Sequence, residues 1–277
     1  MNFIKALILF ILISVIIWII YCFITLPGLS GLGNKTRDPS ISVLDDNRKT
    51  IGSSGDVYAG SSNFNEISEN LIKTVVFVED KRFYSHFGLD IKGLIRAIFY
   101  NLKEARYAQG ASTITQQLSK LIFLDSKKTL SRKMRELIIA FYLEYSFTKE
   151  DILTMYLNRA YFGSGLYGVK AASRRYFASS PNNLTLAESA ILAGTLKAPS
   201  KLSFLVNKDL SIKRAELIIN LLFKENIISE SEKNLANKSL NSFSTQRKNA
   251  TSVKTRYFID WIYTQTPDEI LNSNLSS

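Results

Sequence analysis

The sequence predicts a mainly α-helical protein that carries one N-terminal transmembrane helix. A long uncharged apolar run opens the chain, and helical spacing of apolar residues dominates from Asn65 onward. Capping sequences also mark the starts of several expected helices. At 277 residues with 46% hydrophobic content, the chain is long enough to build one sizeable core.

The apolar run from Ala6 to Leu26 is long enough to cross about 30 Å of hydrocarbon as a helix. A cleaved signal peptide usually has an apolar core of only about 7–15 residues. Here bulky Trp18 and Tyr21 occupy the second half, and Tyr21 stands before Cys22 where a lipoprotein signal needs a small residue. We therefore expect an uncleaved anchor over residues 6–26, preceded by a tail of residues 1–5. The flanking charges are balanced and give no orientation.

Residues 27–62 are rich in Gly, Ser and Asn and predict a linker that contains one short hairpin. Its first strand is expected at Ile41–Leu44, with a turn at Asp45-Asp46-Asn47. Residues 63–226 predict the helical domain, and residues 227–277 predict a polar C-terminal tail.

Apolar residues recur at positions i, i+3, i+4 and i+7 in two segments of the expected helical domain. Each pattern predicts a helix with one half-buried face. The first comprises Ile91, Leu94, Ile95, Ile98, Phe99 and Leu102, and the second Leu130, Met134, Leu137, Ile138 and Phe141.

Three sequences fit the capping box, in which side chains satisfy the free amides of a first helical turn. They start at Thr113, Thr185 and Ser229. Between helices, residues 162–168 contain three glycines, which predict a loop that turns tightly or approaches a ligand closely.

The formal net charge of +11 favours anionic partners such as nucleic acid, anionic lipid or a phosphate-bearing substrate. One cysteine excludes an intramolecular disulfide, and one histidine excludes zinc sites that need two or three histidines.

The first candidate for chemistry is Glu79, which with Asp80 ends the apolar run Val75–Val78 and is followed by His86. A carboxylate at the edge of an apolar surface loses hydration, which suits it to proton transfer near neutral pH. On this segment alone, a solvated helix end with its charges facing water is the favoured interpretation.

Two further segments carry weaker signals. Small residues at 110–112 lead into a capped helix, whose free amides can hold an anion. Arg132 and Glu136 lie four residues apart and share a helix face, as a surface ion pair or as an acid held among phosphate-binding cations.

Together these segments carry five ordered motifs: Glu79-Asp80-x-x-Phe83-x-x-His86, then residues 110–120, Arg132-Lys133-x-x-Glu136, Lys149 to Asn158, and Leu184 to Glu188. They resemble the five sequence blocks of the peptidoglycan glycosyltransferases, glycosyltransferase family 51. The resemblance runs from about Asn65 to Pro199, with departures at Ala111, Leu121 and Thr154.

The resemblance implies a lysozyme-like helical fold beside the bacterial cytoplasmic (inner) membrane, with the N-terminus inside and the domain on the outer (periplasmic) face. It implies polymerisation of lipid II into glycan strands, inversion at the anomeric carbon and release of undecaprenyl pyrophosphate. The implied partners are lipid II, the growing lipid-linked strand and other cell-wall synthesis proteins, with no nucleic acid. The family is blocked by moenomycin.

By motif position, Glu79 resembles the general base that takes the proton of the acceptor sugar's 4-hydroxyl. Glu136 resembles the second glutamate, which helps the pyrophosphate leave or positions a cation on it. The resemblance implies no organic cofactor and leaves a divalent cation (Mg or Mn) as an open expectation. The substrate-binding residues that it implies are Asp80, Phe83, His86, Gly110, Ser112, Thr113, Gln116, Gln117, Lys120, Arg132, Lys133 and Asn158.

Bifunctional relatives add a penicillin-binding transpeptidase domain. Ser146-Phe147-Thr148-Lys149 fits its Ser-x-x-Lys pattern but lies inside the expected transferase, and the sequence contains neither Lys-Thr-Gly nor Lys-Ser-Gly. We expect no transpeptidase activity from this chain. Residues 256–261 resemble the linker that enters such a domain. This resemblance is compatible with a shortened descendant or a fragment of a bifunctional protein, and a naturally monofunctional chain stays open as well.

Three alternatives remain. A lytic transglycosylase or muramidase would cut glycan on a similar fold, although it needs no second glutamate among cations. A non-catalytic scaffold would keep the fold and bind partners, although both glutamates are retained. A nucleic-acid-binding role rests on net charge alone.

Overall fold

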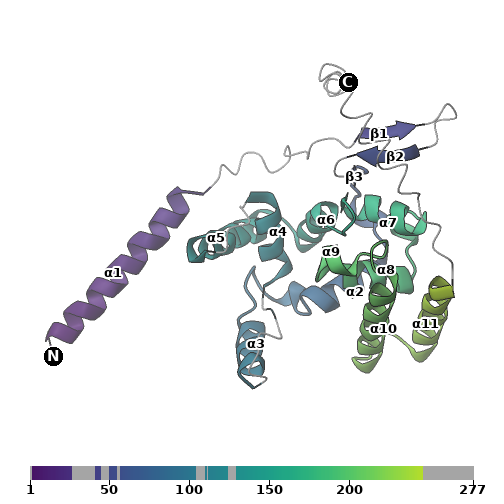
Figure 1. Ribbon diagram of the computed structural model, residues 1–277. Helices are drawn as coiled ribbons and strands as arrows, with labels where there is room; N and C mark the ends of the chain where they lie inside the picture. The colour runs from purple at the N-terminus through teal and green to yellow at the C-terminus, as the bar shows by residue number, and fades with distance from the viewer. Residues whose placement is uncertain are drawn as a thin grey trace, which may run out of the picture. The chain divides into compact units, whose positions relative to one another are not determined.

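The computed structural model describes residues 2–26, 41–44, 50–54, 57–103, 110, 112–123 and 129–245 (Figure 1). The chain divides into two compact units. The first comprises Met1–Lys35 and Ser62–Ala160, and the second comprises Thr36–Ser61 and Tyr161–Ser277. The described residues are mostly helical, which confirms the predicted fold class.

The first unit is built from helices and two short 3-10 turns, η2 (Phe64–Glu66) and η3 (Phe83–Ser85). Helix α4 packs against both α5 and α6, and these contacts form the centre of the unit. Leu118, Ile139, Leu143, Ile152 and Leu157 are fully buried there. The helices are α1 (Asn2–Ile24), α2 (Glu69–Glu79), α3 (Ile91–Lys103), α4 (Ile114–Phe123), α5 (Leu130–Ser146) and α6 (Lys149–Arg159).

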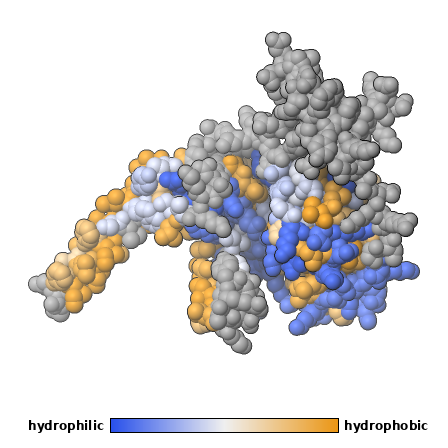
Figure 2. Space-filling view, in the orientation of Figure 1, coloured by the Kyte–Doolittle hydropathy of each residue, from blue (hydrophilic) through white to orange (hydrophobic). Residues whose placement is uncertain are grey.

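Helix α1 meets the length and composition expected of a membrane span over Phe3–Ile24. Most of its side chains are exposed, and Figure 2 shows that the surface along this helix is mostly apolar. Its C-terminal half contacts α5: Trp18 Nε1 donates to Ser131 Oγ at 3.3 Å, and Arg135 Nη2 donates to Thr25 Oγ1 at 2.8 Å.

The helix predicted from Ile91 is present as α3, but the prediction that its apolar face is half-buried is wrong. All six apolar residues of that face are exposed, with Phe99 at 69% and Leu102 at 72%. Figure 2 shows this apolar side of α3. The spacing of the residues predicts a common face, but it does not determine what covers that face.

Helix α5 is also present, and its buried face differs from the predicted one. Of the five predicted residues, Met134, Leu137 and Ile138 are partly buried as expected, whereas Leu130 is 81% exposed and Phe141 is 39% exposed. The buried residues are instead Glu136, Ile139, Ala140, Leu143 and Glu144. Two carboxylates therefore lie on the face of α5 that points into the unit.

The second unit contains two small sheets. Strand β1 (Ile41–Leu44) pairs antiparallel with β2 (Thr50–Ser54), and β3 (Val57–Tyr58) pairs parallel with β4 (Leu166–Tyr167). Strand β1 has the bounds expected of the first hairpin strand, whereas the expected turn at 45–47 lies outside the described residues.

The helices of the second unit gather around α8, which packs against α9, α10 and α11. Helix α8 is almost entirely apolar, which fits its position at the centre. The bounds are α7 (Val169–Phe177), η4 (Pro181–Asn183), α8 (Leu186–Leu196), α9 (Pro199–Leu202), α10 (Lys208–Lys224) and α11 (Glu230–Thr245).

Two of the predicted capping boxes are complete. Thr185 and Glu188 exchange hydrogen bonds at the start of α8, and Ser229 and Glu232 do so at the start of α11. At the start of α4, Thr113 Oγ1 accepts from the backbone amide of Gln116 at 3.2 Å. The Gln116 side chain, however, donates to the Gly88 carbonyl and not to the backbone of Thr113. That box is therefore only half formed.

Helix α11 lies beyond residue 226, where the sequence placed the start of a polar tail. Ile228, Ala236 and Leu240 are buried, and α11 packs against α8 and α10. The helical unit therefore continues to Thr245, because a few apolar residues at helical spacing suffice to dock an otherwise polar helix.

The glycine-rich loop has the backbone that its sequence predicts. Gly163, Gly165 and Gly168 all have φ between 74° and 84°, a region that residues with a Cβ rarely adopt. A Cβ at Gly163 would collide with the Pro199 carbonyl and with Cβ of Ser203. The close approach predicted there is thus made to the chain's own α9 region.

Candidate active site

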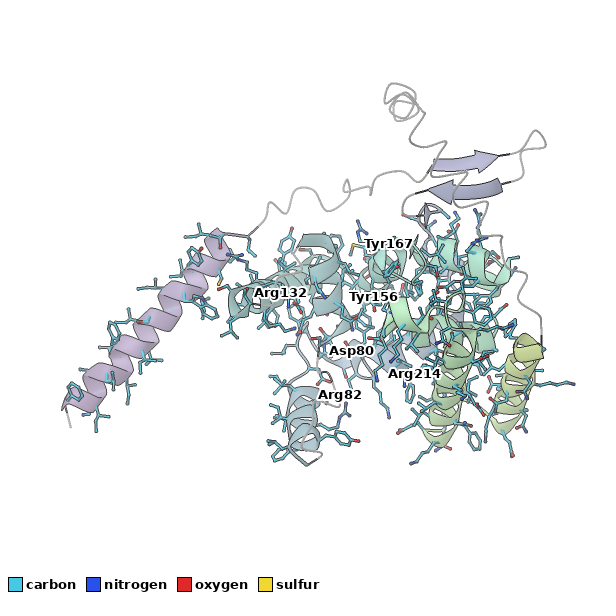
Figure 3. The ribbon with its side chains drawn as sticks, viewed as in Figure 1. Asp80, Arg82, Arg132, Tyr156, Tyr167 and Arg214 are labelled. Atoms are coloured by element: carbon cyan, nitrogen blue, oxygen red, sulfur yellow. The ribbon has the colours of Figure 1, made fainter. Side chains whose placement is uncertain are left out.

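The predicted site residues all lie in the first unit, and they come from the end of α2, from η3, from the start of α4, from α5 and from α6. Figure 3 labels Asp80, Arg132 and Tyr156, which mark three of these elements. Their contacts form two groups, one around Glu79 and one around Glu136.

Glu79 is the last residue of α2 and is half-buried. Gln117 Nε2 donates to Glu79 Oε2 at 3.0 Å. The other end of the same amide, Gln117 Oε1, accepts from the hydroxyl of Tyr156 at 3.0 Å. A neutral chain of two hydrogen bonds therefore runs from α6 through α4 to the proposed base.

Burial raises the pKa of Tyr156 well above its ordinary value of 10.0, and the charge of Glu79 raises it further. The phenol consequently keeps its proton across the physiological range. Because a protonated hydroxyl can donate, Tyr156 can serve as the donor to Gln117.

Asp80 follows Glu79 as the C-cap of α2 and is only 7% exposed. One of its oxygens accepts from the Ile114 amide at 3.0 Å, and Nε2 of His86 lies 3.0 Å from both oxygens. The ring of Phe83 lies edge-on to His86 at 6.3 Å between centroids. These three residues join the end of α2 to the first turn of α4.

Thr113 and Gln116, at the start of α4, both bond to Gly88. Thr113 Oγ1 donates to the Gly88 carbonyl at 2.8 Å, and Gln116 Nε2 donates to it at 3.0 Å. Gly88 has φ of +75°, and a Cβ there would press on the backbone of Ala140 at 3.3 Å. Glycine at this position therefore lets the loop lie directly against α5.

Glu136 occupies a cationic environment. Its side chain is 5% exposed, Lys133 Nζ donates to Oε1 at 2.5 Å, and Arg132 Nη1 lies 3.6 Å from Oε2. Lys133 Nζ also donates to Ser112 Oγ at 3.0 Å and to Gln116 Oε1 at 2.9 Å. Nε and Nη1 of Arg132 are buried and make no hydrogen bond with the described residues, and Nη1 faces Glu136 across the ion pair.

The two groups meet on α4 through two adjacent glutamines. Gln117 donates to Glu79, and Gln116 accepts from the lysine that also bonds to Glu136. One turn of α4 therefore connects Glu79, which accepts from an uncharged amide, with Glu136, which is paired with cations.

The remaining predicted residues are less closely connected. Lys120 is exposed on the last turn of α4, and Gly110 is exposed before that helix. Asn158 is buried and bonds through both ends of its amide to the backbone of Ser62, at 2.9 and 2.8 Å. These two bonds hold the backbone at Ser62, where the chain enters the first unit. They do not connect Asn158 to either glutamate.

Residues that the sequence analysis did not select also make contacts around the site. Lys149 Nζ donates to the His86 carbonyl at 2.7 Å, pairs with Glu144 at 2.8 Å and lies 4.5 Å from the ring centre of Phe83. Thr115 Oγ1 donates to Glu144 at 2.5 Å. Lys149 and Tyr156 both belong to the fourth sequence block, which was the available signal for them.

The residues near Glu136 do not fit a dedicated divalent-cation site. Mg²⁺ and Mn²⁺ prefer several oxygen ligands, whereas both oxygens of Glu136 face cationic side chains. Within the part of the chain that the structure describes, no three His, Cys, Asp or Glu side chains gather into a potential metal site.

Comparison with known proteins places the chain in a family. The family model described as Transglycosylase matches residues 48–223. Penicillin-binding protein 1F of Bacillus subtilis (strain 168) is 37% identical over 230 residues, which cover 79% of this chain and 32% of that protein. Penicillin-binding protein 1A of Vibrio cholerae is 34% identical over 239 residues, which cover 84% of this chain and 29% of the relative.

A solved structure is similar in fold. The crystal structure of penicillin-binding protein 1A from Haemophilus influenzae matches 86% of this chain and 25% of its own, with a TM-score of 0.51 and 20% identity. The chain spans about a third or less of the length of these relatives. Since the family model covers well over half of the chain, the chain belongs to the transglycosylase family, glycosyltransferase family 51.

Proposed function

We propose that the chain is a peptidoglycan glycosyltransferase that polymerises lipid II into glycan strands. The observation that carries this proposal is the link through Gln116 and Gln117, which ties a half-buried carboxylate to a second carboxylate held among cations. A group that takes a proton and a group of cations that receives a leaving phosphate are the two requirements of glycosyl transfer from a pyrophosphate donor.

In the proposed reaction Glu79 takes the proton of the acceptor sugar's 4-hydroxyl. The acceptor oxygen forms a bond to the anomeric carbon of the donor as the bond to the pyrophosphate oxygen breaks. Direct displacement inverts the anomeric centre, because no sugar is bound covalently to the enzyme. The bonding electrons leave with undecaprenyl pyrophosphate.

The cations near Glu136 would stabilise the charge on the departing pyrophosphate. The Arg132 side chain is 17% exposed and the Lys133 side chain is 46% exposed, so both cations can be approached from solvent. Lys120 lies three residues beyond Gln117 and so shares its side of α4, where it can reach the same anion. Glu136 would hold Arg132 and Lys133 in place between turnovers.

The location that supports this activity is the outer face of the bacterial cytoplasmic membrane. Helix α1 would anchor the chain with its N-terminus inside. The exposed apolar side of α3, with basic Lys92 and Arg96 on the same helix, has the composition of a helix that lies in a membrane interface. Both features would keep the site near a lipid-linked substrate.

The proposal is tested by the product that the full-length chain makes from labelled lipid II in detergent. We expect a glycan polymer whose new linkage has the opposite anomeric configuration to the donor, and whose formation stops with moenomycin. Release of soluble muropeptides from purified sacculi, with no polymer from lipid II, would instead establish a lytic enzyme.

A further inference from the structure

Tyr156 is a buried polar side chain that the proposed reaction does not use. It is 2% exposed in the middle of α6, next to Ile152, Leu153 and Leu157, which are fully buried. A tyrosine in such a position is ordinarily part of the core. Its hydroxyl, however, is directed at the side-chain amide of Gln117 on the neighbouring helix α4.

The orientation of the Gln117 side-chain amide determines which of its two ends faces Glu79. A glutamine side chain has a donor end and an acceptor end, and an ionised carboxylate can only accept. With Oε1 held by the tyrosine hydroxyl, Nε2 points at Glu79 Oε2. If the amide were reversed, its oxygen would face the carboxylate and the contact would be repulsive.

We propose that Tyr156 is a positioning residue for the glycosyl transfer: its hydroxyl fixes the orientation of the Gln117 amide, and the amide in turn holds the Glu79 carboxylate in place as an ionised base. This inference rests on the proposed function, because it concerns how the same carboxylate is prepared for proton transfer. The raised pKa of Tyr156 supports it, since the phenol keeps the proton that it donates.

The tyrosine acts through Gln117 and does not touch the substrate. A donor to a carboxylate favours its charged form, so losing the donor makes the carboxylate easier to protonate. The acid limb of the pH–rate profile should therefore move to higher pH when the hydroxyl is removed. Loss of a core contact alone would lower stability without moving that limb.

The test compares Tyr156→Phe with wild type in polymerisation of labelled lipid II by the full-length chain. We expect kcat to fall about five- to tenfold, the effect of one neutral hydrogen bond, with little change in KM. In a Gln117→Leu background, Tyr156→Phe should produce no further loss, because the amide that it orients is gone.

Tyr176→Phe is the matched control. Tyr176 is also a buried tyrosine, and its hydroxyl donates to the Phe162 carbonyl at 2.5 Å in the second unit. Its replacement removes the same atom and should lower stability similarly, but it should leave the acid limb where wild type has it.

A readout without catalysis separates this inference from the proposed function. In the chain labelled with ¹³C at the glutamate carboxyls, the Glu79 signal is assigned by its absence in Glu79→Gln. We expect its titration midpoint to rise in Tyr156→Phe and to stay unchanged in Tyr176→Phe. An unchanged midpoint in Tyr156→Phe would overturn the positioning role, whether or not the wild type forms polymer. If the midpoint rises in Tyr156→Phe but the wild type makes no polymer, only the proposed function would be overturned.

Discussion

Glu79 and Glu136 lie in the same unit but in opposite surroundings. Glu79 is half-buried, ends a helix and receives a hydrogen bond from a neutral amide. Glu136 is almost fully buried, lies inside a helix and is paired with Lys133 and Arg132. The amide that donates to Glu79 is uncharged, whereas Glu136 balances the charges of two cationic side chains.

The groups around two carboxylates of one site can suit them to different roles. In the proposed mechanism, Glu79 is the base that gains and loses a proton in each turnover. Glu136 is the counter-charge that organises cations for a phosphate.

The largest effect is expected from Glu79→Gln. General-base catalysis contributes about 10²–10⁴-fold to a rate, so kcat for lipid II polymerisation should fall by that order while moenomycin binding persists. Glu69→Gln, at the exposed start of the same helix, is the matched control and should polymerise like wild type. Near-normal polymer from Glu79→Gln would remove Glu79 from the reaction.

Glu136→Gln should have a smaller effect of a different kind. The substitution leaves Lys133 and Arg132 without their counter-charge, so the cations should shift rather than disappear. We expect a loss in kcat below the roughly 10²–10³-fold cost of removing a direct transition-state donor. Steady-state kinetics at several substrate concentrations would measure it. Our account fails here if Glu136→Gln abolishes the rate more completely than Glu79→Gln.

Lys133→Met should weaken substrate binding more than it slows the chemistry. It removes one charged donor that contacts Ser112, Gln116 and Glu136, and KM should rise about tenfold. Lys213→Met, at an exposed position on α10, removes the same charge elsewhere and should leave KM unchanged. Equal effects of the two variants would show that net charge, and not this site, attracts the substrate.

The smallest effect is expected from removing divalent cations. Because two cationic side chains already surround Glu136, EDTA treatment should change the polymerisation rate less than Lys133→Met does. The rate is measured before and after adding back Mg²⁺ or Mn²⁺. A rate that disappears with EDTA and returns with either metal would assign the phosphate-side charge to a metal.

Local patterns predicted much of the fold. The helices at Ile91 and Leu130 and the caps at Thr185 and Ser229 follow from residues within a few positions of one another. Burial was harder to predict from the sequence, because the spacing of apolar residues defines a helix face but not what packs against it. The apolar side of α3 is exposed, and the buried side of α5 carries Glu136.

The candidate site divides in the same way. Glu79 and Glu136 could be selected because ordered motifs surround them. The contact of Lys133 with Ser112 joins residues 21 positions apart, and that of Tyr156 with Gln117 joins residues 39 apart. Such contacts arise only when α4 packs against α5 and α6. From the sequence alone, Tyr156 cannot be distinguished from an ordinary core residue, because its contact with Gln117 depends on how α4 packs against α6.

The most direct test of the different tasks is the pH dependence of kcat/KM for lipid II polymerisation in wild type, Glu79→Gln and Glu136→Gln. A base must be ionised to act, so wild-type activity should fall as the pH is lowered. We predict that Glu136→Gln keeps this acid limb at a reduced rate, and that the residual activity of Glu79→Gln lacks it. An acid limb that persists in Glu79→Gln and vanishes in Glu136→Gln would contradict the assignment and exchange the two roles.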